Sequence, residues 1–358
     1  MQIELPISKS IANRWLMLQA IHGDELMPVS DSMPDDVRIL HRSLCLIALS
    51  PHSLIDVGNC GTAMRFLTAY CAQLEGQTTI LDGVERMRHR PIGQLVDALR
   101  EIGADIEYVG EEGFPPLRIK GCILDKHRIV TLNNPQSTQF VSALLLIGAN
   151  VQTDSTSPYI YITQEVIKQY QLSPFSYHLS VEKDWSSAAF WYEYVALHGG
   201  EITLPGLFRD SLQGDKVVAD IFAHLGVHTE YTPEGIILSP IAYSEASNSP
   251  HGGRPIAAQA ASRSKILIQD FRTCPDLYPA VALTCERLGI ELHATGTESL
   301  PIKESDRLRA VREHRTDHDH RMAMALLIAG YEVDDTACIS KSYPQFMEHF
   351  RRINTLKL

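Results

Sequence analysis

A unit made of an amphipathic helix, a glycine break and two short strands recurs along this sequence. In the clearest copy, apolar residues within 95–102 have helical spacing, Gly103 ends the helix, and Glu112-Gly113 separates two short apolar segments. Such repeats exclude a single small module. They predict an α/β chain whose units stack their helices on shared cores, rather than one Rossmann sheet.

The unit appears twice more, and two further copies look shortened. The second copy breaks at Gly226 and repeats the Glu-Gly turn at 234–235, and the third breaks at Gly289. The helix that starts near Asp36 and the helix at 307–313 are each followed by too few residues for a strand pair. We therefore expect these two units to have lost strands.

Length, charge and hydropathy define the class of protein. At about 150 residues per domain, 358 residues predict two domains or slightly more. Lys and Arg number 32 against 43 Asp and Glu, and the net charge of −11 argues against a nucleic-acid binder. No apolar run reaches the roughly 18 residues of a membrane span, and the start MQIELPISKS lacks the features of a signal peptide. We expect a soluble, cytoplasmic protein whose seven cysteines are free thiols.

Two segments mark the organisation of the chain. A new helix begins in the stretch SVEKDWSSAAFW after polar residues, so we place a domain boundary near Lys183. Residues 243–265 are rich in Ser, Ala, Gly and Pro, which predicts a long mobile loop.

Two turns near the start of the chain suit an anion. Lys9, Ser10 and Arg14 lie where a short loop enters a helix, so free backbone N–H groups and two cations are close together. In DVGNCGTAMR, Gly61 frees the backbone and Arg65 follows one helical turn later, and the threonine between them suits a helix cap. Each turn also has an ordinary explanation, which is a solvated turn for the first and a glycine-containing cap for the second.

Arginines cluster before Pro91, a residue typical of the first turn of a helix. Arg86, Arg88 and Arg90 would place positive charge at the positive end of that helix, which favours a bound anion over a solvated face. Farther on, NPQSTQF offers hydroxyl and amide groups before an apolar helix, and helix capping alone explains its serine.

The last third of the chain carries the richest mixture of charges. CPDLYP, PIKESDR, HDHRMAM and SKSYPQF supply cations and carboxylates that suit the binding of several anions together with proton transfer. The alternating HRTDHDH stretch does not favour a metal site, since neighbouring residues do not converge on one face of a helix. Cys60 and Cys274 have no histidine base nearby in sequence, so packing explains them better than nucleophilic catalysis.

Taken together, the motifs resemble the 5-enolpyruvylshikimate-3-phosphate synthase family. SKSxxNR, GNxGTAMR, RxRPIxxLxxAL, DxSSAA, QGD, KESDR, DHRMAM and KSYP follow one another in the family's order, from residue 8 to about residue 346. The resemblance implies two similar α/β domains of three βαβαββ units each around pseudo-threefold axes, an inside-out barrel, with the site in the cleft between them. One domain would hold residues 9–182 and the other residues 1–8 with 183–358. Edge strands of both domains would be missing from the short units.

By the same resemblance, the chain transfers the enolpyruvyl group of phosphoenolpyruvate to the 5-hydroxyl of shikimate 3-phosphate. Phosphate is released, and the reaction belongs to the shikimate pathway of aromatic amino acid biosynthesis. The family needs no metal or organic cofactor and is usually monomeric, so the two substrates are the expected partners, without nucleic acid or membrane. Two alternatives remain, which are an enolpyruvyl transferase for a nucleotide sugar and a non-catalytic ligand-binding protein on a trimmed scaffold.

Matching the family's motifs to this sequence implies its site residues. Asp276 resembles the base for the hydroxyl proton, Glu304 resembles the acid and base at C3, and Lys9 shares in proton transfer. The residues implied to hold shikimate 3-phosphate are Lys9, Ser10, Arg14, Ser137, Thr138, Gln139, Thr156, Asp276 and Lys303. Those implied to hold phosphoenolpyruvate are Lys9, Asn59, Gly61, Arg90, Gln139, Arg307, Arg321 and Lys341, with Arg65 shaping the loop. Each substrate brings a phosphate and a carboxylate, and arginine binds both groups through paired N–H donors.

Overall fold

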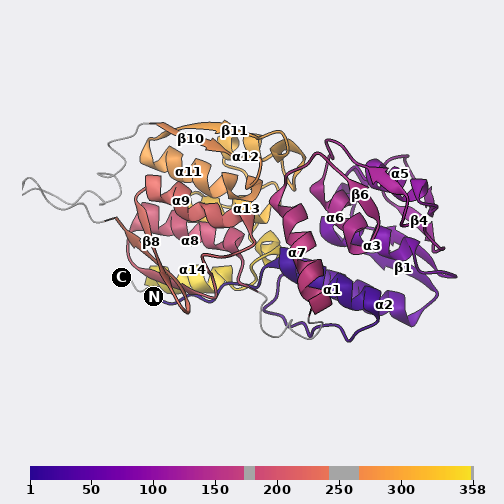
Figure 1. Ribbon diagram of the computed structural model, residues 1–358. Coiled ribbons are helices and arrows are strands. Elements are labelled where there is room, and N and C mark those ends of the chain that lie inside the picture. The colour runs from indigo at the N-terminus through magenta and orange to yellow at the C-terminus, as the bar shows by residue number, and fades with distance from the viewer. Residues whose placement is uncertain (173–181, 242–265, 356–358) are drawn as a thin grey trace, which may run out of the picture. The chain divides into compact units, whose positions relative to one another are not determined.

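The computed structural model describes residues 1–172, 182–241 and 266–355. The chain forms two compact units, an N-terminal unit of Lys9–Val181 and a C-terminal unit of Met1–Ser8 with Glu182–Leu358 (Figure 1). The sequence analysis predicted that the first domain ends at residue 182, which is one residue later than the end of the N-terminal unit at Val181. The loop predicted to be mobile, 243–265, lies outside the described residues.

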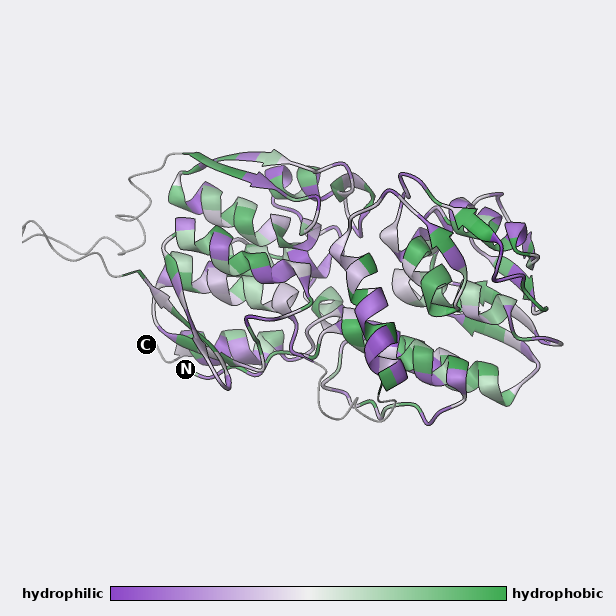
Figure 2. Cartoon of the chain, in the orientation of Figure 1, coloured by the Kyte–Doolittle hydropathy of each residue, from purple (hydrophilic) through white to green (hydrophobic). Residues whose placement is uncertain are grey.

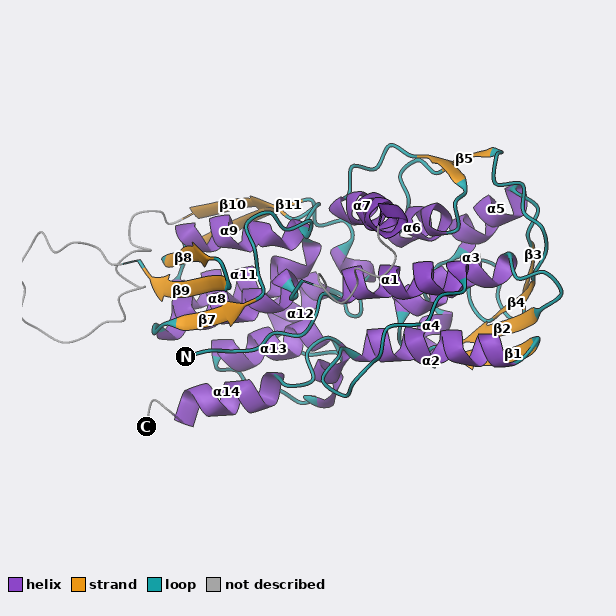
Figure 3. Cartoon of the chain, turned by 60° about the horizontal axis from the view of Figure 1, so that its bottom comes forward, coloured by secondary structure: helices purple, strands orange, loops and turns teal. Residues whose placement is uncertain are grey.

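Helices outnumber strands in the described part of the N-terminal unit, and the strands lie toward its periphery (Figure 3). Its helices are α1 (Lys9–His22), α2 (Asp35–Leu49), α3 (Gly61–Ala72), α4 (Glu85–Arg88), α5 (Gly93–Glu101), α6 (Thr138–Leu146) and α7 (Pro158–Leu172). Its strands are β1 (His52–Asp56), β2 (Thr78–Asp82), β3 (Asp105–Tyr108), β4 (Leu117–Lys120), β5 (Ile129–Thr131) and β6 (Asn150–Gln152).

The repeated units of the N-terminal unit differ in how many strands they keep. One sheet has the order β1-β2-β4-β3, with β1 and β2 parallel and β4 antiparallel to both β2 and β3. The helix α5 and the hairpin β3–β4 confirm the clearest repeat in the sequence. Strands β5 and β6 form a two-stranded parallel pair. Helix α2 is followed by the single strand β1 and then directly by α3, without a strand pair, which confirms that this unit is shortened.

The C-terminal unit is built in the same way. Its helices are α8 (Trp185–His198), α9 (Val218–His224), α11 (Tyr278–Leu288), α12 (Arg307–Glu313), α13 (His320–Ala329) and α14 (Phe346–Thr355). Single 3-10 turns are η2 (Gly214–Val217), η4 (Pro275–Leu277), η5 (Leu300–Ile302) and η6 (Ala337–Lys341). Its strands are β7 (Ile202–Pro205), β8 (Val227–Thr232), β9 (Gly235–Pro240), β10 (Ile266–Asp270) and β11 (Glu291–Thr295).

Its sheets repeat the pattern of one fuller sheet and one parallel pair. Strands β7, β9 and β8 form an antiparallel sheet, which Gln2 extends through a bridge to Thr203. The parallel pair is β10 and β11. Helix α9 with β8 and β9 confirms the second repeat, and α11 with β11 confirms the third.

The shortened unit after α12 closes with a tight turn in place of a strand pair. Residues 314–319 lead directly from α12 to α13. His314, Asp317 and His318 have φ values of 52°, 46° and 59°, in the left-handed region that side-chain-bearing residues rarely adopt. This turn brings the charged residues before α12 close in sequence to the start of α13.

Apolar helix faces form the two cores (Figure 2). In the C-terminal unit, α8 is apolar on nearly all sides and packs against α11 and α13, with Trp185 and Trp191 fully buried. A helix that is hydrophobic all round belongs at the centre of a domain. In the N-terminal unit, Trp15 of α1, Phe66 of α3 and Phe140 of α6 are buried in the same way. These buried side chains fix the positions of α1, α3 and α6 in the N-terminal unit. Packing against α8 does the same for α13 in the C-terminal unit.

Candidate active site

The first turn of α1 carries Lys9 and Ser10. Nζ of Lys9 lies 3.1 Å from Oδ2 of Asp36, which stands in the first turn of α2. Only 5% of the Asp36 side chain is exposed, so this carboxylate holds the lysine at the start of its helix. Sequence reasoning selected Lys9 and missed this partner, although the acidic pair in PDDVR was visible.

Arg14 lies one turn farther along α1 and is buried. Its guanidinium donates hydrogen bonds to Oγ1 of Thr163 at 2.7 Å and Oγ of Ser142 at 3.1 Å. It also donates to the carbonyl oxygens of Tyr159 at 3.0 Å and Ser10 at 2.6 Å. Burial lowers the pKa of Arg14 to about 10. This arginine therefore ties α1 to α6 and α7.

Two arginines converge on Gly61 at the start of α3. Nη1 of Arg65 donates to the carbonyl oxygen of Gly61 at 3.0 Å. A Cβ atom on Gly61 would lie 2.4 Å from Nη1 of Arg65 and 2.5 Å from Nη1 of Arg90. The glycine leaves the space that both guanidinium groups occupy. The structure therefore brings together residues that the sequence supplied from two separate motifs.

Replacing Gly61 by alanine is expected to raise the KM for phosphoenolpyruvate by at least about tenfold, or about 1.4 kcal/mol. The new methyl group must displace the guanidinium groups of Arg65 and Arg90, and the family resemblance implies that Arg90 binds this substrate. Steady-state kinetics at saturating shikimate 3-phosphate measures the effect. Gly93→Ala is the matched control, because a Cβ there meets its nearest neighbour at 3.5 Å, an ordinary contact. Equal KM values in the two variants would contradict the role of Gly61.

Polar side chains join α3 to α6. Nε2 of Gln139 donates to Oγ1 of Thr62 at 2.9 Å. The expectation that Thr62 caps α3 is therefore wrong, and the thiol of Cys60 caps it instead by accepting the N–H of Ala63 at 3.3 Å. Ser137 does cap α6, accepting the N–H of Gln139 at 3.4 Å.

A pocket of about 710 Å³ opens at the carboxyl ends of β5 and β6. Parallel strands commonly present ligand sites at this edge. Hydroxyl groups of Thr153, Ser155, Thr156 and Ser157 line it, and Thr156 is the sequence-predicted site residue among them. The pocket is thus a polar recess next to the first turn of α7.

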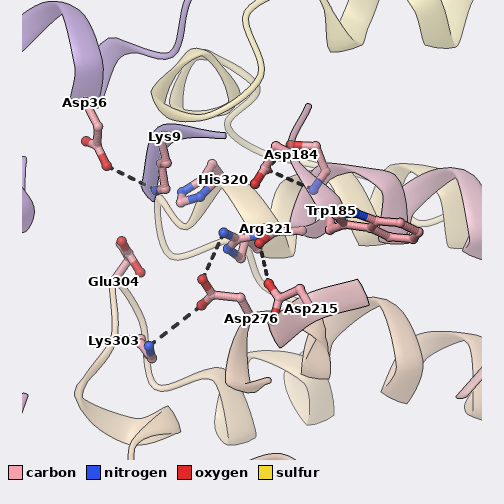
Figure 4. A network of polar contacts seen from close by, with 12 residues as sticks. Lys9, Asp36, Asp184, Trp185, Asp215, Asp276, Lys303, Glu304, His320 and Arg321 are labelled. Atoms are coloured by element: carbon pink, nitrogen blue, oxygen red, sulfur yellow. Dashed lines mark hydrogen bonds and ion pairs between the residues drawn. The ribbon is translucent and has the colours of Figure 1, made fainter. Parts of the chain in front are cut away.

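Asp276 lies at the centre of the charged cluster in the C-terminal unit (Figure 4). It comes from η4, and its carboxylate oxygens lie 2.8 Å from Nη1 of Arg307 and 2.9 Å from Nη2 of Arg321. Nζ of Lys303 is 3.7 Å away. Three cations predicted from two separate motifs, KESDR and DHRMAM, therefore surround one carboxylate.

Arg307 joins this centre to Glu304. Its Nη2 atom lies 3.1 Å from Oε2 of Glu304, and its Nε atom lies 2.8 Å from Oδ2 of the fully buried Asp319. Lys341 holds the other oxygen of Glu304 at 3.0 Å. Glu304, the candidate acid and base for C3 of phosphoenolpyruvate, is thus fixed between two cations.

The cluster perturbs the protonation of its own cations. Burial disfavours the charged form of Arg307, but Asp319, Asp276 and Glu304 outweigh it and hold the pKa of Arg307 above its ordinary value. Burial lowers the pKa of Lys303, partly offset by Asp276. The Nη1 atom of Arg321 is buried and has no hydrogen-bond partner among the described residues. Such a donor suits an incoming anion.

Part of the expectation for the arginine cluster before Pro91 is wrong. Arg88 lies in the one-turn helix α4 and pairs with Asp82 at 2.7 Å, so it is held at the surface by carboxylates. Sequence reasoning counted Asp319 among the charged residues of its string but did not pair it with Arg307, and it missed the contact between Ser186 and Asp215. The strings DHRMAM, DxSSAA and QGD contained or adjoined these residues, but no spacing rule pairs them.

Several other expectations concern simple properties of the chain. All seven cysteines are free thiols, as predicted. The part of the chain that is described contains no group of three or more His, Cys, Asp or Glu side chains placed to hold a metal ion. None of the described helices combines the length and hydropathy needed to cross a membrane.

Known proteins resemble this chain in sequence and fold. The family model of EPSP synthase (3-phosphoshikimate 1-carboxyvinyltransferase) matches residues 26–173, 146–314 and 311–350. A 3-phosphoshikimate 1-carboxyvinyltransferase from Bacteroides fragilis is 36% identical over 411 residues, which cover 98% of this chain and 94% of that protein. One from Colwellia psychrerythraea is 28% identical over 441 residues, covering 99% and 96%. Both aligned stretches exceed the 358 residues of this chain, so each relative has residues that this chain lacks.

A solved structure agrees with the fold. The EPSP synthase from Acinetobacter baumannii superimposes with a TM-score of 0.66 at 19% identity, covering 98% of this chain and 95% of that one. This likeness confirms the predicted α/β class with two domains of repeated units. Together with the sequence matches, it establishes that the chain belongs to the EPSP synthase family.

Proposed function

We propose that this chain transfers the enolpyruvyl group of phosphoenolpyruvate to the 5-hydroxyl of shikimate 3-phosphate and releases phosphate. The observation that carries the proposal is the fixed position of Glu304 between Arg307 and Lys341, beside Asp276. Two carboxylates among buried cations suit a reaction that binds anions and moves two protons.

The chemistry proceeds by addition and elimination. The 5-hydroxyl oxygen bonds to C2 of phosphoenolpyruvate while its proton passes to Asp276, and C3 gains a proton from Glu304. Elimination then returns a C3 proton to Glu304, and the bond between C2 and the phosphate oxygen breaks. Lys9, held by Asp36 at 3.1 Å, shares in proton transfer.

The substrate contacts divide by chemistry. For shikimate 3-phosphate we assign hydroxyl, amide and cationic groups, namely Lys9, Ser10, Arg14, Ser137, Thr138, Gln139, Thr156, Asp276 and Lys303. For phosphoenolpyruvate we assign mainly cations with the glycine turn, namely Lys9, Asn59, Gly61, Arg90, Gln139, Arg307, Arg321 and Lys341. Buried arginines hold phosphate and carboxylate strongly because two N–H groups meet two oxygens.

Phosphate release tests the proposal. We expect release that needs both phosphoenolpyruvate and shikimate 3-phosphate and persists without added metal. Omitting either substrate is the control. If a cooperatively folded protein binds shikimate 3-phosphate but releases no phosphate, the non-catalytic alternative replaces this proposal. Binding itself is measured as a rise in melting temperature with the ligand.

A further inference from the structure

Asp215 is a buried carboxyl group for which the mechanism above has no role. It lies in η2, directly after Gly214 of the QGD string, and its side chain receives a hydrogen bond from Oγ of Ser186 in α8. The residue is only 4% exposed. A buried acid without a cation bound to it directly costs free energy when it ionises.

Charged groups face Asp215 from three other elements. Asp276 of η4 and Arg321 of α13 interact with it electrostatically, as does Asp184, the N-cap of α8. Burial first, and then the charge of Asp276, raise the pKa of Asp215 to about 7, while Arg321 and Ser186 act in the opposite direction. The thiol of Cys274, also nearby, has its pKa raised to about 12 by burial and stays neutral.

Arg321 has one anionic partner at contact distance and one donor to spare. Its Nη2 atom lies 2.9 Å from Asp276, and its buried Nη1 has no hydrogen-bond partner among the described residues. Figure 4 shows the side chains of Asp215 and Asp276 next to each other, both below Arg321 in that view. A second ionised carboxylate at this place would offset the positive charge that an anionic substrate needs.

We propose that Asp215 is a positioning residue whose neutral carboxyl group keeps Arg321 available to the carboxylate or phosphate of phosphoenolpyruvate. The inference rests on the proposed function. When Asp215 ionises, the site gains a negative charge beside Arg321 and binds the substrate anion less well. Ser186 tunes this step, because its hydroxyl donates to the carboxyl and so favours the ionised form.

The dependence of kcat/KM for phosphoenolpyruvate on pH tests this inference. In the wild type, we expect a fall of about tenfold between about pH 6.5 and pH 8.5, since a group with a pKa near 7 loses its proton across that interval. In Asp215→Asn the side chain stays neutral, so this fall should shrink to less than about twofold. Asp220→Asn, which removes an exposed carboxylate on α9, should keep the wild-type profile.

A second variant and a second measurement separate this role from a structural one. Ser186→Ala removes the hydroxyl that favours ionisation, so the alkaline fall should move to higher pH. The melting temperature is the second measurement, and it does not depend on turnover. The folded state raises the pKa of Asp215, so wild-type stability should decrease as pH rises toward 7 and Asp215→Asn should melt higher at pH 8.5.

Two results would overturn the inference in an active enzyme. One is a wild-type alkaline fall that persists in Asp215→Asn, and the other is an equal loss of kcat/KM at every pH in that variant. The proposed function fails separately, because it fails only if the wild type releases no phosphate at any pH.

Discussion

Arg307→Ala should lower the free energy of unfolding by about 3–5 kcal/mol and abolish measurable phosphate release. Arg307 is the shared partner of Asp276, Glu304 and Asp319, all within 3.1 Å of its nitrogen atoms. Its removal leaves three carboxylates together, of which Asp319 is fully buried. An uncompensated buried charge costs far more than the loss of a surface ion pair.

Equilibrium unfolding in urea at neutral pH measures the change in stability. Arg312→Ala is the matched control, since Arg312 lies in the same helix, α12, and is exposed. The control should change stability by less than about 0.5 kcal/mol. A variant as stable as the control would show that the network does not hold this unit together.

Glu304→Gln should lower kcat by about a thousandfold, within the range of general acid and base catalysis. The amide keeps the shape of the side chain, and its single carbonyl oxygen can replace one of the two carboxylate oxygens that Arg307 and Lys341 hold at 3.1 and 3.0 Å. It cannot carry a proton to C3 of phosphoenolpyruvate and back. Binding of both substrates should therefore survive while turnover fails.

Single-turnover and steady-state phosphate release measure this effect. Exchange of the C3 protons of phosphoenolpyruvate with deuterated solvent should disappear in parallel. Glu298→Gln is the control, because Glu298 is exposed and lies six positions before Glu304. If Glu304→Gln keeps more than about a tenth of the wild-type kcat, another group moves the C3 proton, since loss of a general acid or base removes at least about a hundredfold.

Local patterns in the sequence predicted much of the fold. The helix of the first copy, its terminal glycine and its hairpin all depend on residues within thirty positions of one another, and they became α5, β3 and β4. The same local argument found the two shortened units, because too few residues follow α2 and α12 for a strand pair. Strand order could not be read in this way, since the insertion of β4 between β2 and β3 is a tertiary pairing.

The sequence predicted most of the residues of the candidate site, but it predicted few of the contacts between them. Asp276 was selected from one string and Glu304 and Arg307 from another, and the structure joins all three. That Arg88 pairs with Asp82, whereas Arg90 faces Gly61, depends on the one-turn helix α4. Partners such as Asp36 for Lys9 come from elements 27 positions away, and no periodic pattern encodes that distance.

The two-stranded sheet of the C-terminal unit leaves a free edge, with a consequence for how the protein behaves at high concentration. Among the described residues, β11 pairs with β10 alone, so its other side presents unpaired N–H and C=O groups. Exposed strand edges are templates for pairing between molecules. Glu291 and His293 carry their ion pair, at 2.7 Å, on this strand. Glu291 thus places a carboxylate on this edge strand, and a charged side chain at a strand edge disfavours pairing with a second copy of the chain.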